Sequence, residues 1–259
     1  MSMDHISYSF LHLLACPYAA FLRYEAALRG PTTIWLALGS AVHFALEVGH
    51  TENNLDITHL INVFKAEYNR IVTEDEVFVS YPQLIKQEGE GMTMLEVYHA
   101  QIKSGQIAEH PLDVEKEFRI PIAGTHLVGR IDKIEQDDAG EYSIIDYKTG
   151  KAKPDGWFLR HNVQLTAYYW ACYEIYGKYP KKLIWHHLRT GELIETERTP
   201  ADVEQLKLMI NNAVKMKSLD MRHRIFHEKV CEWCDYRGAI CDDLELEQRV
   251  VDNLGNSNK

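Results

Sequence analysis

Residues 129–150 read GRIDKIEQDDAGEYSIIDYKTG, and this stretch predicts two strands joined by a tight turn. Asp132 lies on the first strand, and Asp146 ends the second strand directly after the apolar pair Ile144-Ile145. Because a short turn joins the strands, we expect them to pair and both carboxylates to meet at one end of the sheet. Two carboxylates a few ångströms apart bind hard divalent cations such as Mg²⁺ or Mn²⁺. The stretch therefore predicts a metal site at this sheet end.

A lysine lies two residues after the second aspartate. On an extended segment, the side chains of Lys148 and Asp146 therefore point to the same face. A cation beside Asp146 could polarise a phosphate oxygen and acidify a bound water. Lys148 could position that water and offset charge in the transition state. Solvated charges at a strand end are the alternative, which the apolar run before Asp146 and the Thr149-Gly150 turn disfavour.

The sequence on either side predicts an α/β domain with a central mixed sheet flanked by helices. The expected helices cover residues 5–29 (with a break at Pro17), 34–50, 57–72, 82–105, 161–177 and 200–219. The expected strands cover residues 114–122, 126–136, 142–147, 182–188 and 192–198. We expect one integrated domain with a mainly helical region over 1–110, a sheet core over 111–220 and a C-terminal cysteine lobe over 221–259.

Composition narrows the class of protein. The chain has 259 residues and a formal net charge of −10, which argues mildly against non-specific binding to nucleic acid, although it says nothing of local patches. No apolar stretch is long enough for a transmembrane helix, so we expect no membrane association. An odd number of cysteines, five, without a secretion signal argues against a disulfide framework and predicts a cytoplasmic protein.

Three of the cysteines form a tight cluster, Cys231-x2-Cys234-x6-Cys241. Three thiolates are an incomplete site for zinc or an iron–sulfur cluster, and Cys16 is the candidate fourth ligand. Free thiols with a chance spacing are the alternative. The remaining cysteine, Cys172, lies on the apolar side of an expected helix and is interpreted as a core residue.

The two motifs GRID and IDYKTG together resemble the core of the PD-(D/E)XK nuclease superfamily, in its RecB-like branch. The resemblance implies a restriction-endonuclease-like fold. It also implies that Asp132, Asp146 and Lys148 are the catalytic set, with the carbonyl of Tyr147 as a further metal ligand.

Two other segments resemble motifs of the same family, in the same order along the chain. Residues 39–43, GSAVH, resemble an upstream helix motif whose histidine ligates metal, which implies that role for His43. Residues 164–168, QLTAY, resemble a motif associated with DNA contact, which implies that Gln164 and Tyr168 contact DNA. These two residues are four positions apart on one helix face. Taken alone, His43 would be an ordinary helix histidine and Tyr168 a core residue. Glu117 is a weaker candidate near the site.

The cysteines narrow the resemblance to the AddB and CRISPR-associated exonuclease types. It implies that Cys16, Cys231, Cys234 and Cys241 hold a 4Fe–4S cluster, with zinc as the alternative. The implied function is a Mg²⁺- or Mn²⁺-dependent DNA exonuclease acting on single strands or DNA ends. The sequence has no Gly-x4-Gly-Lys-Ser/Thr motif, so unwinding would need a helicase partner, in a CRISPR or recombination setting. The alternative function is a non-catalytic iron–sulfur or zinc protein that binds DNA or acts as a scaffold.

Overall fold

The computed structural model describes residues 5–77, 79–217, 219, 221–232, 234–237 and 240–241. Residues group into two compact units, each assembled from separate segments of the chain. Unit 1 draws on residues 1–31, 121–128 and 207–259, and unit 2 on residues 32–120 and 129–206. Because β2, β3 and α8 contribute residues to both units, these units differ from the three consecutive regions expected from the sequence.

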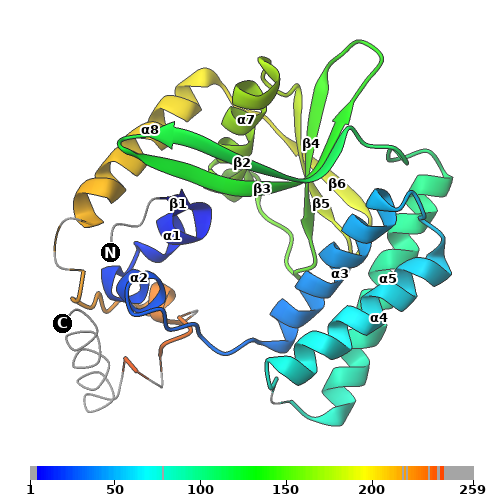
Figure 1. Ribbon diagram of the computed structural model, residues 1–259, viewed down its shortest axis with the longest axis horizontal. Helices are drawn as coiled ribbons and strands as arrows, with labels where there is room; N and C mark the ends of the chain where they lie inside the picture. Colours follow the sequence, from blue (N-terminus) through cyan, green and yellow to red (C-terminus); the bar gives the residue numbers. More distant parts are fainter. Residues whose placement is uncertain are drawn as a thin grey trace. The chain divides into compact units, whose positions relative to one another are not determined.

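Three long helices of unit 2 lie side by side (Figure 1). They are α3 (Ile34–Thr51), α4 (Ile57–Glu74) and α5 (Tyr81–Lys103). The side chains of Thr33 and Asp56 accept hydrogen bonds from the first-turn N–H groups of α3 and α4, and a capping box begins α5. Such caps satisfy donors that a helix start leaves unpaired, which explains why the helices begin there.

The mixed sheet predicted from the sequence is confirmed. Its unit 2 strands are β2 (Asp113–Ile122), β3 (Thr125–Gln136), β4 (Tyr142–Lys148), β5 (Lys182–His187) and β6 (Glu192–Thr196). The order is β3-β4-β5-β6, with β2 beside β3. Strands β3/β4 and β5/β6 are antiparallel, whereas β4/β5 is parallel, and α6 (Gly156–Arg160) and α7 (Val163–Tyr176) lie in the crossover between them.

Strand β4 presents different side chains to the two faces of the sheet. Ile145 and Tyr147 join the apolar cluster formed by α3, α4 and α5. The alternate residues, Asp146 and Lys148, point to the opposite face, where α7 packs. One strand therefore contributes both to a helical core and to a polar face.

Unit 1 joins segments from both ends of the sequence. Its described elements include β1 (Ile6–Ser7), α1 (Tyr8–Leu13), α2 (Pro17–Tyr24) and α9 (Glu228–Glu232). Residues 207–217, in the last turns of α8 (Pro200–Lys217), also belong to it. Strand β1 pairs in parallel with Leu127 and Val128 of β3. The Tyr236 hydroxyl donates a hydrogen bond to the Leu28 carbonyl at 2.7 Å, which ties the C-terminal segment to the N-terminal one.

One expected helix is divided in the structure. Residues 5–29 form β1, α1 and α2, and the predicted break at Pro17 is the start of α2. The helix expected over residues 161–177 is confirmed as α7, and the short helix α6 before it was not predicted. In the part of the chain that the structure describes, no helix combines the length and apolar character required to cross a bilayer.

Candidate active site

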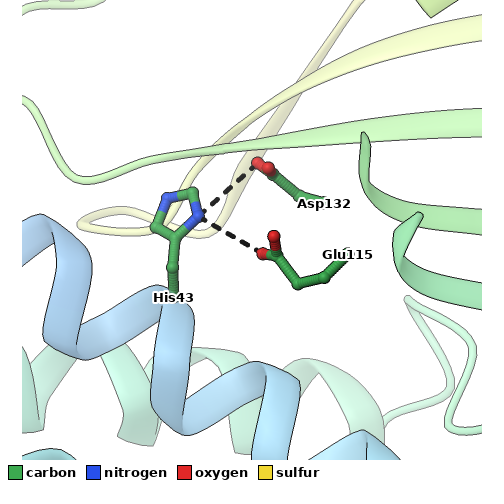
Figure 2. Close-up of side chains that lie close together, drawn as sticks. All are labelled: His43, Glu115 and Asp132. Carbon is green, nitrogen blue, oxygen red and sulfur yellow. Dashed lines mark ion pairs between the residues drawn. The ribbon is translucent and has the colours of Figure 1, made fainter. Parts of the chain in front are cut away.

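Three ligand-type side chains converge beside the sheet of unit 2 (Figure 2). His43 projects from α3, Glu115 from β2 and Asp132 from β3. The Nδ1 atom of His43 is 3.7 Å from Asp132 Oδ2 and 3.9 Å from Glu115 Oε1. One ligand atom from each residue lies within 4.8 Å of the other two, a spacing at which a single ion can reach all three.

Asp146 and Lys148 lie at the neighbouring strand end. The antiparallel register pairs Lys133 with Ile145, so the next step along both strands places Asp132 opposite Asp146. The Asp146 side chain is buried, and the Lys148 ammonium is 2.6 Å from its Oδ2 atom. The other oxygen, Oδ1, is buried without a hydrogen-bond donor among the described residues. An orphaned carboxylate oxygen in the interior is unfavourable unless a cation satisfies it.

The electrostatics of the cluster favour a bound cation. Burial raises the pKa of Asp132 above its ordinary value, and the Asp146 charge adds to this effect against the opposing influence of His43. Burial also raises the pKa of Asp146, although Lys148 opposes the shift. For His43, burial opposes protonation, but the carboxylates of Asp132 and Glu115 outweigh it and raise its pKa. Carboxylate oxygens with one imidazole nitrogen suit a divalent cation such as Mn²⁺ or Mg²⁺.

Tyr147 connects the two carboxylate strands. Its backbone N–H donates a 2.7 Å hydrogen bond to Asp132 Oδ2, where the β3/β4 backbone pairing has ended. Its ring meets the His43 ring edge to face, with centroids 5.7 Å apart. The peptide between Asp146 and Lys148 is therefore held against the Asp132 carboxylate.

A buried hydrogen-bond network supports the Tyr147 side chain from behind. Its hydroxyl lies 2.8 Å from the Tyr98 hydroxyl, which in turn lies 2.7 Å from His50 Nε2. Lys133, 1% exposed, donates to the Tyr98 hydroxyl at 3.3 Å and pairs with Glu135 at 2.8 Å. Networks of this kind fix side chains when their members are satisfied. Here the network fixes the residue between the two predicted catalytic groups.

The structure also brings Gln164 and Tyr168 to this face. Lys148 Nζ donates a 3.1 Å hydrogen bond to Gln164 Oε1, and Gln164 Nε2 donates a 2.8 Å hydrogen bond to the Tyr168 hydroxyl. Tyr168 is buried, and its ring meets that of Phe118 edge to face. The pair therefore orients Lys148, while Tyr168 also belongs to the core. Contact of either residue with DNA stays a prediction.

Sequence reasoning missed Glu115 and named Glu117 only as a weak candidate, with a surface charge as the better interpretation. Glu117 is exposed, whereas Glu115 faces His43 and also pairs with Arg130 at 2.9 Å. Glu47 lies one turn after His43 on α3, close enough to Glu115 for the two carboxylates to interact. Burial and the Glu115 charge raise the Glu47 pKa, with Arg130 opposing.

The four cysteines of the predicted cluster line a single cavity in unit 1, here called the cysteine cavity. It has a volume of about 420 Å³ and is lined by Cys16, Cys231, Cys234, Cys241, Arg224, Ile225, Phe226, His227, Val230 and Arg237. The fifth cysteine, Cys172, is buried on α7, where its thiol donates to the Lys178 carbonyl at 3.4 Å. Burial raises the pKa of the Cys172 thiol to about 12, as expected for an inert core residue.

Comparison with known proteins adds to this geometry. The sequence model of the PD-(D/E)XK nuclease superfamily matches residues 5–242. No curated protein matches the sequence significantly. A solved structure described as a "putative exonuclease" from Eubacterium rectale is 12% identical, with a TM-score of 0.54 over 85% of this chain and 81% of its own. The structure of SSO0001 is 14% identical, with a TM-score of 0.43 over 91% of this chain and 85% of its own. The likeness to the Eubacterium rectale structure shows a shared fold.

Proposed function

Since this chain belongs to the PD-(D/E)XK nuclease superfamily, we propose that it is a divalent-metal-dependent DNA exonuclease that hydrolyses phosphodiester bonds. The observation that carries the proposal is the pair of buried carboxylates, Asp132 and Asp146, at neighbouring strand ends with Lys148 beside them. The fold is the restriction-endonuclease-like α/β fold implied by the motifs, and nucleases of this superfamily act with divalent metals.

The residues present fit a divalent cation. His43, Asp132, Asp146 and the carbonyl of Tyr147 would hold it, and Glu115 adds a carboxylate that the motifs did not indicate. When bound, the cation would supply Lewis acidity and make a coordinated water a stronger nucleophile at neutral pH. The orphaned Asp146 Oδ1 atom would then gain the partner that it lacks among the described protein groups.

In this proposal, Lys148 stabilises the negative charge that develops on the phosphate during cleavage. Its ammonium is held between the Asp146 carboxylate and the Gln164 amide oxygen, which limits the positions available to it. A fixed cation at the mouth of a buried acidic site stabilises negative charge that develops on phosphate oxygens. The Tyr168 hydroxyl orients Gln164, and Gln164 in turn positions Lys148.

The test uses purified full-length protein with linear single-stranded DNA, linear duplex and closed circular single strands, each with Mg²⁺, Mn²⁺ or EDTA. Linear DNA should be degraded with either metal, whereas EDTA and circular substrates should give no products. Asp146→Asn and Lys148→Ala should slow cleavage by roughly 10²- to 10⁴-fold. Asp138→Asn, which changes an exposed aspartate in the β3–β4 turn, should cut at the parent rate.

Three results would overturn parts of this proposal. If Asp146→Asn cuts DNA as fast as the parent, Asp146 is not part of the active site. DNA binding without any cleavage in either metal would replace the nuclease with a non-catalytic DNA-binding protein. Cutting of circular strands would replace exonuclease action with endonuclease action.

For the cysteine cavity, we propose a 4Fe–4S cluster held by Cys16, Cys231, Cys234 and Cys241, as in the RecB-like branch. Four thiolates on one cavity suit either such a cluster or zinc. The resemblance to the iron–sulfur branch of the family favours the cluster.

Metal analysis after anaerobic purification tests this assignment. We expect a brown protein with iron and acid-labile sulfide in equal amounts. Cys16→Ser should lose most of that iron, whereas Cys172→Ser, the matched control at the buried α7 cysteine, should retain it. A colourless protein with stoichiometric zinc would overturn the cluster in favour of zinc. Retained iron in Cys16→Ser would remove Cys16 from the ligand set.

The same family branch suggests a setting for the enzyme. Because the sequence has no phosphate-binding motif of a helicase, we propose that any unwinding comes from a helicase partner in a CRISPR or recombination system. Copurification of a nucleic-acid-stimulated ATPase with the tagged chain, and faster duplex digestion in its presence, would support such a partner. Rapid digestion of blunt duplex by the isolated chain would make it unnecessary.

A further inference from the structure

An exposed aromatic pair is formed by Trp157 of α6 and His161, the C-cap residue of that helix. The ring of Trp157 stacks on that of His161, with centroids 4.6 Å apart and planes tilted by 29°. Trp157 is nevertheless 73% exposed. A tryptophan at this exposure contributes little to the core, so its stacked ring is available to a ligand.

Ring contacts connect this pair to the candidate active site. Phe158, the residue after Trp157, meets the Trp185 ring edge to face with centroids 6.0 Å apart. The Lys148 ammonium lies 5.0 Å from the centroid of the same Trp185 ring. Phe158, the chain neighbour of Trp157, is therefore linked to the predicted catalytic lysine by one ring–ring contact and one cation–ring contact, all within unit 2.

A lysine on the segment just after Lys148 contacts a second indole, which belongs to α3. Arg189 Nε donates a 2.7 Å hydrogen bond to the Thr149 carbonyl, which anchors the start of this segment. Lys151 then places its ammonium 4.5 Å from the ring centroid of Trp35 on α3. Residues 149–161, which follow Lys148, thus carry both a lysine that contacts an exposed indole and the exposed Trp157–His161 rings.

This combination fits unpaired nucleotides better than a duplex. Every base has a π-face that can stack on an aromatic side chain, and a single strand exposes those faces whereas a duplex hides all but its end pairs. A chain with a net charge of −10 repels phosphates over long distances, so stacking must supply a large share of the affinity. Isolated rings interleaved with a lysine also differ from the broad apolar patch that a protein partner would cover.

Building on the proposed nuclease function, we propose that the Trp157–His161 ring pair is a base-stacking site for single-stranded DNA approaching the active site. Lys151 contacts the phosphate of the same strand. The chain therefore prefers single strands, or the frayed and overhanging ends of duplexes, over intact duplex.

The test measures the binding of a fluorescein-labelled single strand and of a blunt duplex of equal length by anisotropy, in EDTA so that cleavage does not intervene. The parent should bind the single strand more tightly than the duplex. Trp157→Ala should weaken single-strand binding roughly 5- to 150-fold, the range for losing one base–aromatic stack, with duplex binding unchanged. Trp157→Phe should retain most of the affinity. Lys151→Ala should lower the slope of log affinity against log salt by about 0.7.

Tyr81→Ala is the matched control, because Tyr81 is an equally exposed aromatic residue, also 73%, at the start of α5. It should bind both DNA forms as the parent does. Unchanged single-strand affinity in Trp157→Ala would overturn the proposal. An equal loss for single strand and duplex would also overturn it, because that pattern marks a structural role. If the parent cuts no DNA in Mg²⁺ or Mn²⁺, the nuclease proposal fails, whereas selective loss of single-strand binding still supports the stacking site.

Discussion

Glu115 lies beside His43 and Asp132, and its backbone departs from regular strand geometry at this point. Its φ angle is 46°, in the left-handed region that non-glycine residues seldom adopt. Further along β2, Phe118 and Ile120 are buried while Glu117 is exposed. A left-handed residue interrupts the alternation of faces, as a bulge does. Strand periodicity alone cannot indicate such an interruption, and strained residues of this kind often occur at functional sites.

The two glutamates of β2 provide a matched pair for testing the metal site. Glu115→Gln removes one charge from the group around His43 and should weaken Mn²⁺ binding by roughly 10- to 100-fold. Glu117→Gln makes the same chemical change on an exposed side chain and should have no effect. Calorimetric titration with Mn²⁺, and the Mn²⁺ concentration for half-maximal cleavage, provide the measurement. Similar behaviour of the two variants would exclude Glu115 from the site.

Tyr98 is expected to position the site through Tyr147. Tyr98→Phe removes the hydroxyl shared by Tyr147, His50 and Lys133, which should reduce the free energy of unfolding by about 1–3 kcal/mol. Because the Tyr147 side chain then loses its hydrogen bond to Tyr98, the Mn²⁺ concentration needed for half-maximal cleavage should also rise severalfold.

Tyr68→Phe is the control for that variant. The Tyr68 hydroxyl is also in the interior of unit 2 but donates only to the Leu84 carbonyl, at 3.3 Å. This variant should lose stability without changing the Mn²⁺ requirement. An unchanged requirement in Tyr98→Phe would confine Tyr98 to a structural role. Urea titration and metal-dependent cleavage measure the two effects separately.

The residues of the site differ in how far the sequence could predict them. Asp146 and Lys148 share a face because strand periodicity is two, so a local pattern was enough. His43 was indicated only by its resemblance to a family motif. Tyr98 and Lys133 were not predicted, because their partners lie 49 and 35 positions away in the sequence. No local pattern encodes such contacts.

At the level of elements, the packing of α5 against α3 and α4 depends on a glycine. A Cβ atom at Gly91 would lie 2.2 Å from Phe64 Cζ and 2.9 Å from Leu38 Cδ1. Two residues earlier, a Cβ at Gly89 would meet nothing within 4 Å. The same helix therefore offers one glycine required by close approach and one that only lowers helix propensity.

Alanine at these two positions should have opposite effects. Gly91→Ala should destabilise the protein by about 1–3 kcal/mol, because the rigid Phe64 ring must shift to relieve the overlap. Gly89→Ala should stabilise it by about 0.5–1 kcal/mol through helix propensity. Urea unfolding followed by circular dichroism gives both values. A neutral Gly91→Ala would mean that the helices can separate at no cost.

The elements that the sequence did not predict are short ones. Strand β1 has two residues, and it exists because Ile6 and Ser7 pair with distant residues of β3. Helix α6 has five residues, and the Asn162 side chain caps α7 separately by accepting from the Leu165 N–H. Periodicity identifies elements that span several turns or alternations, which is why α3, α4, α5 and the sheet strands were predicted within a few residues.

For the molecule as a whole, buried neutral histidines predict loss of stability in acid. Burial lowers the pKa of His186 to about 3, and Lys133 contributes in the same direction. The unfolded chain takes up a proton near the ordinary histidine pKa of about 6.5, while the folded chain does not. Stability from this group is therefore present above pH 6.5 and lost as the pH falls from there toward 3. The raised pKa values of Asp132 and Asp146 act in the opposite direction.

A comparison of variants separates these opposing contributions. Between pH 7 and pH 5, His186→Gln should lose about 2 kcal/mol less unfolding free energy than the parent, because it removes one proton-uptake site from the unfolded chain. Glutamine can still donate toward Gln101, whose Oε1 atom is 2.8 Å from His186 Nε2. Urea titrations at both pH values measure the difference. Parallel pH dependence in the two proteins would show that His186 is protonated in the fold.

The assembly of unit 1 from both ends of the sequence also determines when it can form in the cell. Tyr236 anchors to Leu28, and Cys16 shares its cavity with Cys231, a residue that the ribosome adds 215 positions later. At roughly 5–20 residues per second, the N-terminal segment waits about 10–40 s for its partners during synthesis. Unit 2, which ends at residue 206, is complete before the last three cysteines are made. The candidate active site in unit 2 can therefore fold cotranslationally, whereas closure of the cysteine cavity is a late event in biogenesis.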